Sequence, residues 1–287
     1  MRITDIIRHR RPVFSLEFFP PKSPDEMALL YQVLNEVKDL APGYVSVTYG
    51  AGGGTRDKTF EIAERAKSEI GLESAAHLTC VGNSKDEIAL ILNGLVSSGI
   101  ENVVALRGDP PNGDPRFIPQ PDGFRHASEL TEFIRKSYPL CIAVAGYPEG
   151  HIEAPDKETD WIHLEEKVNA GADLIITQLF FENSYFYEFE NRLRQRGVSV
   201  PIIPGILPIT NFQQTVRIAR FCGARIPDKV LQELAVIQNN PGAVQKYGIE
   251  YATQQCKDLL AHGVPGIHFY TLNKSRATRE IIRSLDA

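Results

Sequence analysis

Glu17 is the residue of this sequence whose surroundings most directly indicate chemistry. It lies in the apolar, strand-like segment Phe14-Ser-Leu-Glu-Phe-Phe19, between aromatic side chains. Strands of a parallel sheet that are buried on both faces read as nearly continuous apolar runs, so a carboxyl group inside one is unusual. Burial makes the anion unfavourable, which predicts a raised pKa for Glu17. A carboxyl group that titrates near neutral pH can serve as a general acid.

Six other apolar segments carry polar residues close to their carboxyl ends. These residues are Thr48, His77, Thr79, Arg107, Asp109, Tyr147, Gln178 and Tyr270. If the segments are the strands of one parallel barrel, their carboxyl ends converge on one mouth, where the active sites of such barrels lie. The alternative is that each is a buried polar residue with its own hydrogen-bond partners and no shared role. This alternative explains any single residue more easily than it explains the whole set. We therefore expect a shared site.

The spacings that other catalytic sites require are absent from the sequence. The seven histidines are His9, His77, His126, His151, His163, His262 and His268. They form no H-x-x-x-H pair and no familiar ligand spacing with Asp or Glu, so we expect no metal, with His9 exposed and His262 and His268 structural or solvated. No G-x-S-x-G turn occurs, and lysine is nearly absent from strand ends, which disfavours Schiff-base chemistry. The remaining acid–base residues and Arg-Gly turns suit an organic cofactor or an anionic ligand.

Eight apolar, β-rich segments must position these side chains. They are Val13–Phe19, Tyr44–Tyr49, Ser74–Cys80, Asn102–Leu106, Leu140–Ala145, Asp173–Leu179, Val200–Leu207 and Gly266–Leu272. Most of their starts lie roughly 30 residues apart, the length that a strand, a helix and two loops need. The last interval is about twice as long as one such unit, and it contains an additional helical pattern near Pro227–Gln238.

Helix-start signals separate the apolar segments. Ser23-Pro-Asp-Glu26 and Ser84-Lys-Asp-Glu87 are capping boxes, and Thr210-Asn-Phe-Gln213 predicts a third. Helices are expected at 24–39, 57–70, 84–98, 128–137, 160–170, 183–196, 211–222 and 243–262, with a last one after Asn273.

Alternation of strands and helices predicts an α/β fold with a parallel sheet. Eight units in 287 residues fit a single (β/α)8 TIM barrel with an extra helix before the last strand. The alternative is a doubly wound open sheet, which needs a phosphate-binding fingerprint after an early strand. The nearest candidate, Gly50-Ala-Gly-Gly-Gly-Thr55, fails G-x-G-x-x-G at its last position. No linker or repeat is present, so we expect residues 1–287 to form one domain.

The composition is that of an ordinary globular protein. With 31 basic and 36 acidic residues the formal net charge is −5, which argues against a nucleic-acid-binding face. The start of the chain lacks the apolar core of a signal peptide, and no apolar run reaches the ~20 residues of a membrane helix, so a cytoplasmic protein is expected. Cys80 and Cys141 lie in apolar runs and are expected to be buried thiols, as suits a reducing compartment.

Several segments also match a known family, in order and at consistent spacing. The longest match surrounds Glu17. The matching segments are Phe14-Ser-Leu-Glu-Phe-Phe-Pro-Pro-Lys22, Val45-Ser-Val-Thr-Tyr-Gly50, Ala76-His-Leu-Thr-Cys80, Ala105-Leu-Arg-Gly-Asp-Pro110, Ile176-Thr-Gln-Leu-Phe-Phe181, Ile202-Ile-Pro-Gly-Ile-Leu-Pro208 and His268-Phe-Tyr-Thr-Leu-Asn273. Over nearly its whole length the chain resembles methylenetetrahydrofolate reductases, in the short form that has only the catalytic barrel.

The resemblance implies a (β/α)8 barrel that binds FAD at its mouth. NADH or NADPH would reduce the flavin, and flavin N5 would pass a hydride to 5,10-methylenetetrahydrofolate in a ping-pong scheme that gives 5-methyltetrahydrofolate. A homo-oligomer is implied as well. An alternative from another class is a non-catalytic pterin- or nucleotide-binding barrel that acts as an accessory subunit. The joint presence of Glu17 and Asp109 argues against such a binder.

By motif, the resemblance makes Glu17 the general acid that opens the imidazolidine ring and places Asp109 beside the flavin and the pterin. Positions that match FAD contacts are Thr48, Tyr49, Ala51, His77, Arg107, Gly108, Asp109, His126, Ala127, Tyr147, His151, Asp160, His163 and Lys167. Positions that match substrate contacts are Glu17, Thr48, Asp109, Gln178, Gln214, Tyr270 and Lys274. Arg107 and Lys167 would face the anionic pyrophosphate.

Some of these positions have simpler explanations. Asp160 could be a helix N-cap, Lys167 a solvated helix lysine, and Gly50–Gly54 only a tight loop. The chain departs from enterobacterial members of the family at His126, His163, Glu166, Ile218 and Lys274. None of these departures involves the expected general acid.

Overall fold

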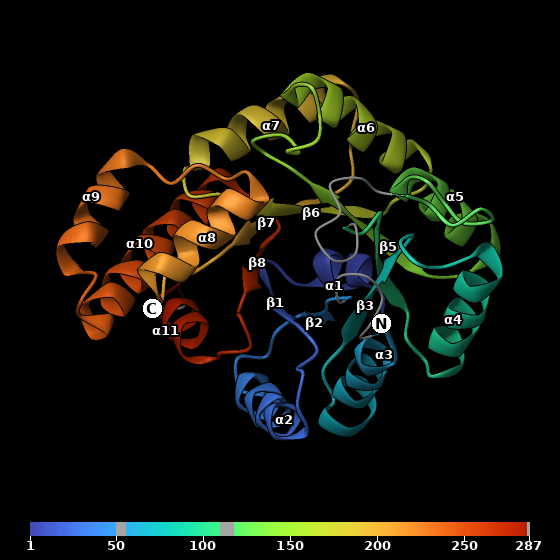
Figure 1. The fold of residues 1–287 in the computed structure, drawn as a ribbon, viewed down its shortest axis with the longest axis horizontal. Helices are drawn as coiled ribbons and strands as arrows, with labels where there is room; N and C mark the ends of the chain where they lie inside the picture. Colours follow the sequence, from blue (N-terminus) through green and yellow to red (C-terminus); the bar gives the residue numbers. More distant parts are fainter. Residues whose placement is uncertain (50–55, 110–117, 286–287) are drawn as a thin grey trace.

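Eight parallel strands pair in chain order, and β8 pairs with β1, so the sheet closes into a barrel (Figure 1). The strands are β1 (Val13–Phe18), β2 (Tyr44–Val47), β3 (Ser74–Thr79), β4 (Asn102–Leu106), β5 (Cys141–Gly146), β6 (Leu174–Leu179), β7 (Ile202–Ile206) and β8 (Gly266–Tyr270). The structure is a computed structural model that describes residues 1–49, 56–109 and 118–285. Each strand overlaps its predicted segment. The predicted (β/α)8 barrel is confirmed, and the open-sheet alternative is wrong.

Helices surround the barrel on its outside (Figure 1). They are α2 (Pro24–Lys38), α3 (Arg56–Arg65) continuing into the π-helical turn η2 (Ala66–Ile70), α4 (Lys85–Ser97), α5 (Ala127–Ser137), α6 (Lys157–Asn169), α7 (Asn183–Gln195), α8 (Phe212–Cys222), α9 (Asp228–Ile237), α10 (Pro241–His262) and α11 (Arg276–Leu285). The predicted extra helix before the last strand is α9, which confirms that part of the prediction.

Two of the three predicted capping boxes are present. The Ser23 and Ser84 side chains accept from the backbone N–H groups of Glu26 and Glu87, whose carboxylates accept in return. The third prediction is wrong, because α8 begins one residue later than expected and Asn211 is its N-cap. The Asn211 side chain accepts from the backbone N–H of Gln214. Asn is itself a strong N-cap, and it takes the role predicted for Thr210.

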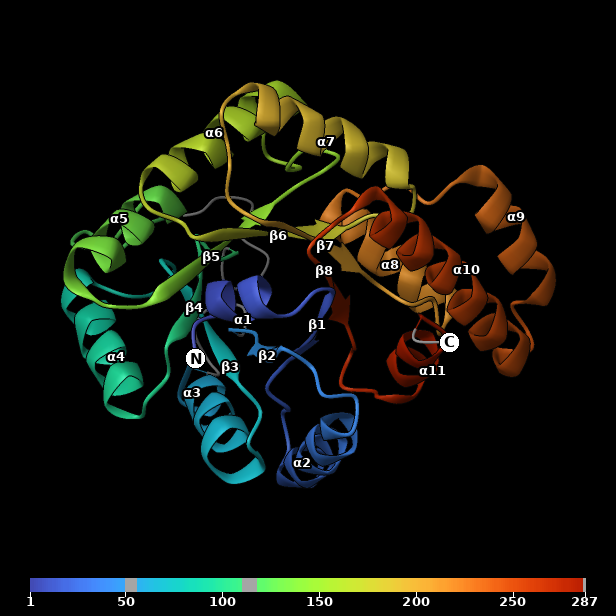
Figure 2. The ribbon, with the colours of Figure 1, turned by 180° about the vertical axis from the view of Figure 1, so that it is seen from behind.

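A short helix that the sequence did not predict, α1 (Ile3–His9), lies across the amino-terminal end of the barrel (Figure 2). Ile3 and Ile7 are fully buried and pack against apolar strand residues such as Val104. Their i, i+4 spacing places both on one face of the helix. The helix therefore closes the end of the barrel opposite the mouth, and His9 at its end is exposed, as expected.

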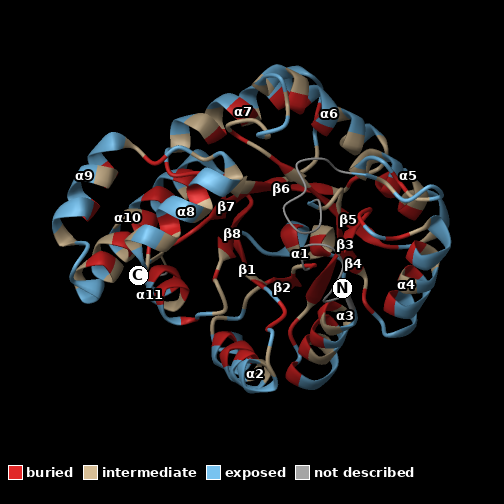
Figure 3. Cartoon of the chain, in the orientation of Figure 1, coloured by how far each residue is buried: buried red, intermediate tan, exposed pale blue. Residues whose placement is uncertain are grey.

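Successive residues of each strand alternate between the barrel interior and the layer of helices. On β1, Leu16 and Phe18 belong to the main apolar cluster between barrel and helices. Glu17 faces the interior, where the register sets it between Ser46 on β2 and Tyr270 on β8. Figure 3 shows the strands and the inner faces of the helices buried and the outer helix faces exposed. Apolar packing thus supports the barrel from outside and leaves its mouth for polar groups.

Gly248 of α10 allows that helix to approach the loop after β7. A methyl group at Gly248 would lie 1.8 Å from the carbonyl oxygen of Ile209. We expect Gly248→Ala to destabilise the protein by about 3 kcal/mol, because the clash is with backbone that must move. Urea unfolding of the two proteins measures this difference.

Gly94 of α4 is the matched control for this substitution. A methyl group there would meet no described atom within 4 Å. We expect Gly94→Ala to stabilise the protein by about 0.5–1 kcal/mol, because alanine loses less backbone entropy in a helix. If both substitutions changed the free energy of unfolding equally, the close packing of α10 at Gly248 against Ile209 would be contradicted.

The four cysteines are free thiols, and Cys80, Cys141 and Cys256 are buried. The prediction for Cys80 and Cys141 is confirmed. Within residues 1–49, 56–109 and 118–285, no helix has the length and apolar character needed to cross a membrane.

Candidate functional site at the barrel mouth

Glu17 lies inside the barrel near the carboxyl ends of the strands, with 17% of its side chain exposed. Its Oε2 atom is 3.3 Å from Nε2 of His77 on β3 and 3.3 Å from Nε2 of His268 on β8. Behind this group, Nδ1 of His268 is 2.8 Å from the hydroxyl of Ser15. The Ser46 hydroxyl approaches Oε2 at 3.5 Å. A carboxylate and two imidazoles therefore meet at the mouth.

The expected rise in the pKa of Glu17 is wrong. Burial does raise it, but the facing imidazoles of His268 and His77 outweigh burial and lower the pKa of Glu17 to about 2. The sequence shows the aromatic neighbours along the strand. It does not show the imidazoles, which barrel closure brings from strands far away in the chain.

This lowered pKa predicts a specific loss of stability in acid. The unfolded chain binds the Glu17 proton from about pH 4.5 downward and the folded chain only near pH 2. Stability present above pH 4.5 is therefore lost as the pH falls through this window, by about 3 kcal/mol. Urea unfolding between these pH values should show that Glu17→Gln lacks this part of the acid dependence. Parallel curves for the two proteins would contradict the pairing of Glu17 with His77 and His268.

His268 was expected to be structural or solvated, and the solvated alternative is wrong. It is completely buried, and its Nε2 lies 3.3 Å from Oε2 of Glu17. A signal was available, because His268 and Tyr270 are two residues apart on one strand and share its inward face. Ser15 and Ser46 were also missed, and Ser15 shares the inward face of β1 with Glu17 in the same way.

The segment after β4 carries Arg107, Gly108 and Asp109. The guanidinium of Arg107 donates to both carboxylate oxygens of Glu153, at 2.5 and 2.9 Å. Gly108 has a φ of +86°, and a methyl group there would lie 2.6 Å from Val81, so this turn requires glycine. Asp109 is exposed, and after burial its charge is the largest contribution that raises the pKa of Cys222 to about 11.

Residues of β5 and α6 form the next part of the wall. The ring of Tyr147 meets His151 edge-on, with centroids 4.7 Å apart. Asp160 is buried, and burial raises its pKa. Lys167 donates to the carbonyl of Ala145 at 2.6 Å, and burial lowers its pKa to about 8. Lys167 is thus not a solvated lysine.

The N-cap of α6 is Asp156, whose side chain accepts from Thr159 N. The alternative that Asp160 is a helix cap is therefore wrong.

The remaining expected substrate contacts lie on β6, on α8, and on or after β8. Gln178 is half-buried, and its side-chain oxygen accepts from the backbone N–H of Leu179 at 2.9 Å, next to a shift in the pairing register of β6 and β7. The Tyr270 hydroxyl donates to the Thr177 carbonyl at 2.7 Å. Tyr270 and the exposed Lys274 line a hollow of about 260 Å³. Gln214 lies in the first turn of α8.

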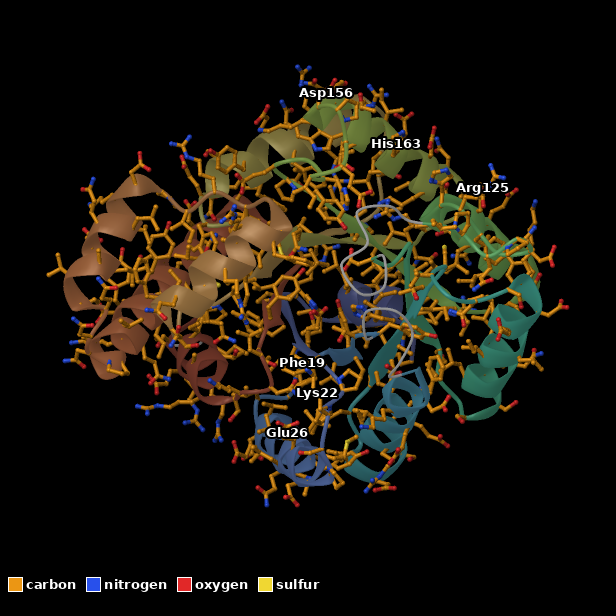
Figure 4. The ribbon with its side chains drawn as sticks, viewed as in Figure 1. Phe19, Lys22, Glu26, Arg125, Asp156 and His163 are labelled. Carbon is orange, nitrogen blue, oxygen red and sulfur yellow. The ribbon has the colours of Figure 1, made fainter. Side chains whose placement is uncertain are left out.

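Four of the expected cofactor contacts lie in the layer of helices or next to it, namely Tyr49, His126, Ala127 and His163. The buried side chain of Tyr49 packs on Phe60 in the layer between barrel and helices, so Tyr49 can offer the mouth only its backbone. His126 is exposed immediately before α5, and Ala127 is the first residue of that helix. His163 is exposed on α6, and Figure 4 shows it on the outer ring of helices, across the molecule from Phe19. Thr48 is half-buried after β2, and Ala51 lies outside the described residues.

Three buried polar atoms around the mouth have no hydrogen-bond partner among the described residues. They are Oγ1 of Thr79, Oδ2 of Asp160 and Nε2 of His77, whose 3.3 Å ion-pair contact with Glu17 is not a hydrogen bond. Buried polar atoms are almost always hydrogen-bonded, so these atoms indicate a place for a polar ligand. Within the described ranges, no group of three or more His, Cys, Asp or Glu residues could hold a metal ion.

Comparison with known proteins agrees with the family resemblance seen in the sequence motifs. A family model described as methylenetetrahydrofolate reductase matches residues 2–286. The chain is 41% identical over 295 residues to "Methylenetetrahydrofolate reductase (NADH) 1" of Arabidopsis thaliana, covering 99% of this chain and 50% of that protein. It is 37% identical over 273 residues to the 5,10-methylenetetrahydrofolate reductase of Escherichia coli, covering 94% of this chain and 90% of that protein.

The chain spans about half the length of the plant relatives. Among solved structures, a Clostridium thermocellum protein described as binding two copies of 5-methyl-5,6,7,8-tetrahydrofolic acid has the same fold, with a TM-score of 0.62. The two chains are 14% identical, and the match covers 100% of this chain and 98% of the other. The family model and the bacterial relative show that the chain belongs to the methylenetetrahydrofolate reductase family.

Proposed function

We propose that the chain reduces 5,10-methylenetetrahydrofolate to 5-methyltetrahydrofolate, with FAD as cofactor and NADH or NADPH as electron donor. The observation that carries this proposal is the contact of Glu17 with two imidazoles at the mouth of a barrel of this family. A binding protein gains nothing from a half-buried carboxylate held in this way, whereas a reaction that needs a proton at one atom does.

The residues present fit a flavin dinucleotide. Asp160 offers a buried carboxylate oxygen that lacks a donor among the described residues, and ribose hydroxyls are suitable donors. Thr79 offers a hydroxyl oxygen in the same condition on β3. The residues that would hold the group share the walls formed after β2 to β5 and on α6. They are Thr48, His77, Arg107, Gly108, Tyr147, His151, Asp160 and Lys167.

The flavin, when bound, supplies a two-electron carrier that can accept a hydride from a nicotinamide and give one to a folate. The task of the chain is to hold the pterin and to supply a proton. Asp109 follows β4 and Gln178 lies on β6, and together they would hold the pterin. Tyr270, Gln214 and Lys274 would contact the rest of the substrate. Lys274 and the hollow that it lines suit an anionic group.

Glu17 would provide the proton that the leaving amine nitrogen needs when the imidazolidine ring opens. In the chain alone its pKa is about 2, so the pKa of Glu17 must rise when substrate binds before this residue can donate a proton. Nε2 of His268 lies 3.3 Å from Oε2 of Glu17, and Ser15 holds the other ring nitrogen. A substrate that displaces water from the mouth disfavours the anion and so favours the protonated form of Glu17.

We also propose that residues 1–287 form one catalytic FAD-binding domain, that the protein works in the cytoplasm, and that it forms a homo-oligomer. The closure of one barrel by strands from both ends of the chain, β1 and β8, supports the single domain. Sedimentation of the purified protein tests the assembly.

The direct test of the proposed reaction is product formation. The purified protein should be incubated with FAD, 5,10-methylenetetrahydrofolate and either NADH or NADPH, and the folates separated by chromatography. The proposal expects 5-methyltetrahydrofolate in large molar excess over protein with at least one of the donors. Folate binding without turnover under these conditions would contradict the proposal and support a non-catalytic barrel.

A further inference from the structure

We infer that Glu153, in the loop between β5 and α6, is a positioning residue for the cofactor site and acts by fixing the guanidinium of Arg107. The pair is bidentate, with Arg107 Nη1 2.5 Å from Oε2 and Nη2 2.9 Å from Oε1. Bidentate carboxylate–guanidinium pairs fix orientation as well as distance. The Arg107 side chain is 25% exposed and that of Glu153 is 44% exposed. The arginine is therefore the inner member of the pair.

The backbone of the loop places Glu153 where it can hold Arg107. The backbone N–H of Glu153 donates to Nδ1 of His151 at 3.1 Å, which requires that nitrogen to be unprotonated. Burial lowers the pKa of His151, which favours this state. Nearby, Glu149 accepts from the backbone N–H of Arg225 at 3.0 and 3.1 Å. The loop is thus tied to β4 on one side and to the segment after α8 on the other.

Fixing Arg107 matters for affinity. A long side chain that is free before binding loses conformational entropy when it contacts a ligand, and this loss weakens binding. The rotamer entropy of a free arginine side chain is large. Glu153 and the Gly108 carbonyl, which accepts from Arg107 Nε at 3.3 Å, restrict this freedom before any ligand binds. A guanidinium has five N–H donors, so it can keep Glu153 and also donate to a phosphate oxygen. Glu153 therefore orients Arg107 for a pyrophosphate, and the Glu153–Arg107 pair does not need to break when the pyrophosphate binds.

The test compares flavins with and without phosphate groups, and it rests on the proposed flavin site. Protein freed of flavin should be titrated with FAD and with riboflavin, with quenching of flavin fluorescence as the readout. We expect Glu153→Gln to weaken FAD binding about fivefold and to leave riboflavin binding unchanged. The matched control is Glu132→Gln, which removes an exposed carboxylate that pairs with Lys136 on α5 and should alter neither affinity.

A double substitution separates an action through Arg107 from a general effect on the loop. In an Arg107→Ala background, Glu153→Gln should have no further effect on FAD affinity. A further fivefold loss in that background, or FAD binding by Glu153→Gln as tight as or tighter than wild type, would overturn the inference. If Glu153→Gln does not fold, Glu153→Asp keeps the charge with a shorter reach and should show a smaller loss. Failure of the wild-type protein to bind either flavin would instead overturn the proposed function.

Discussion

Glu17→Gln is expected to slow the reduction of 5,10-methylenetetrahydrofolate by about 10²–10⁴-fold, the usual contribution of a general acid. The amide has nearly the shape of the carboxyl group but has no proton to give at neutral pH. Reduction of the flavin by NADH or NADPH needs no proton from this residue and should proceed at the wild-type rate. Stopped-flow absorption of the flavin measures the two half-reactions separately.

A matched control is Glu61→Gln, an exposed carboxylate on α3 that pairs with Arg65. It should leave both half-reactions unchanged. If Glu17→Gln kept a wild-type folate half-reaction, the general-acid role would be wrong. If it lost flavin binding as well, Glu17 would act mainly in building the site.

His268→Leu is expected to destabilise the protein by about 3 kcal/mol at neutral pH, because it leaves a half-buried carboxylate without one of its two imidazole partners. His268 is completely buried, and its two ring nitrogens face Ser15 and Glu17. Leucine fills a similar volume but can partner neither group. Urea unfolding measures the loss of stability.

A double-mutant cycle tests whether this loss arises from Glu17. In a Glu17→Gln background, His268→Leu should cost at least about 1 kcal/mol less than in the wild type, because no charge is left unpaired. In the single variant His268→Leu, the pKa of Glu17 should rise, because burial is then opposed by His77 alone. Additive effects of the two substitutions would contradict the coupling.

Most of the fold could be predicted from the sequence because its elements are marked locally. Apolar runs mark the strands, and Ser23 and Ser84 mark helix starts through contacts only three residues apart. The errors arose where local signals compete or are short. Asn211 is as good a cap as Thr210, and a helix as short as Ile3–His9 is recognisable only by the pair of residues that it buries.

The candidate site could be predicted only in part, because alternation along a strand gives the face of a residue and not its partner. Glu17 was found as a polar residue in an apolar strand, yet its pKa was predicted in the wrong direction. The partners that lower it are His268 and His77, which lie on β8 and β3 and reach Glu17 only when the barrel closes. Glu153 was missed for a related reason, since an acidic residue in a polar loop carries no local signal of the arginine that it holds.

The central claim is that this barrel moves electrons from a reduced nicotinamide to a folate through a bound flavin. The most direct measurement is an anaerobic absorption spectrum of the purified, FAD-loaded protein during two successive additions. Addition of NADH, or of NADPH in a parallel sample, should bleach the flavin, and addition of 5,10-methylenetetrahydrofolate should then restore its colour. A protein that takes up no flavin, or a bleached flavin that the folate leaves unchanged, would contradict the claim.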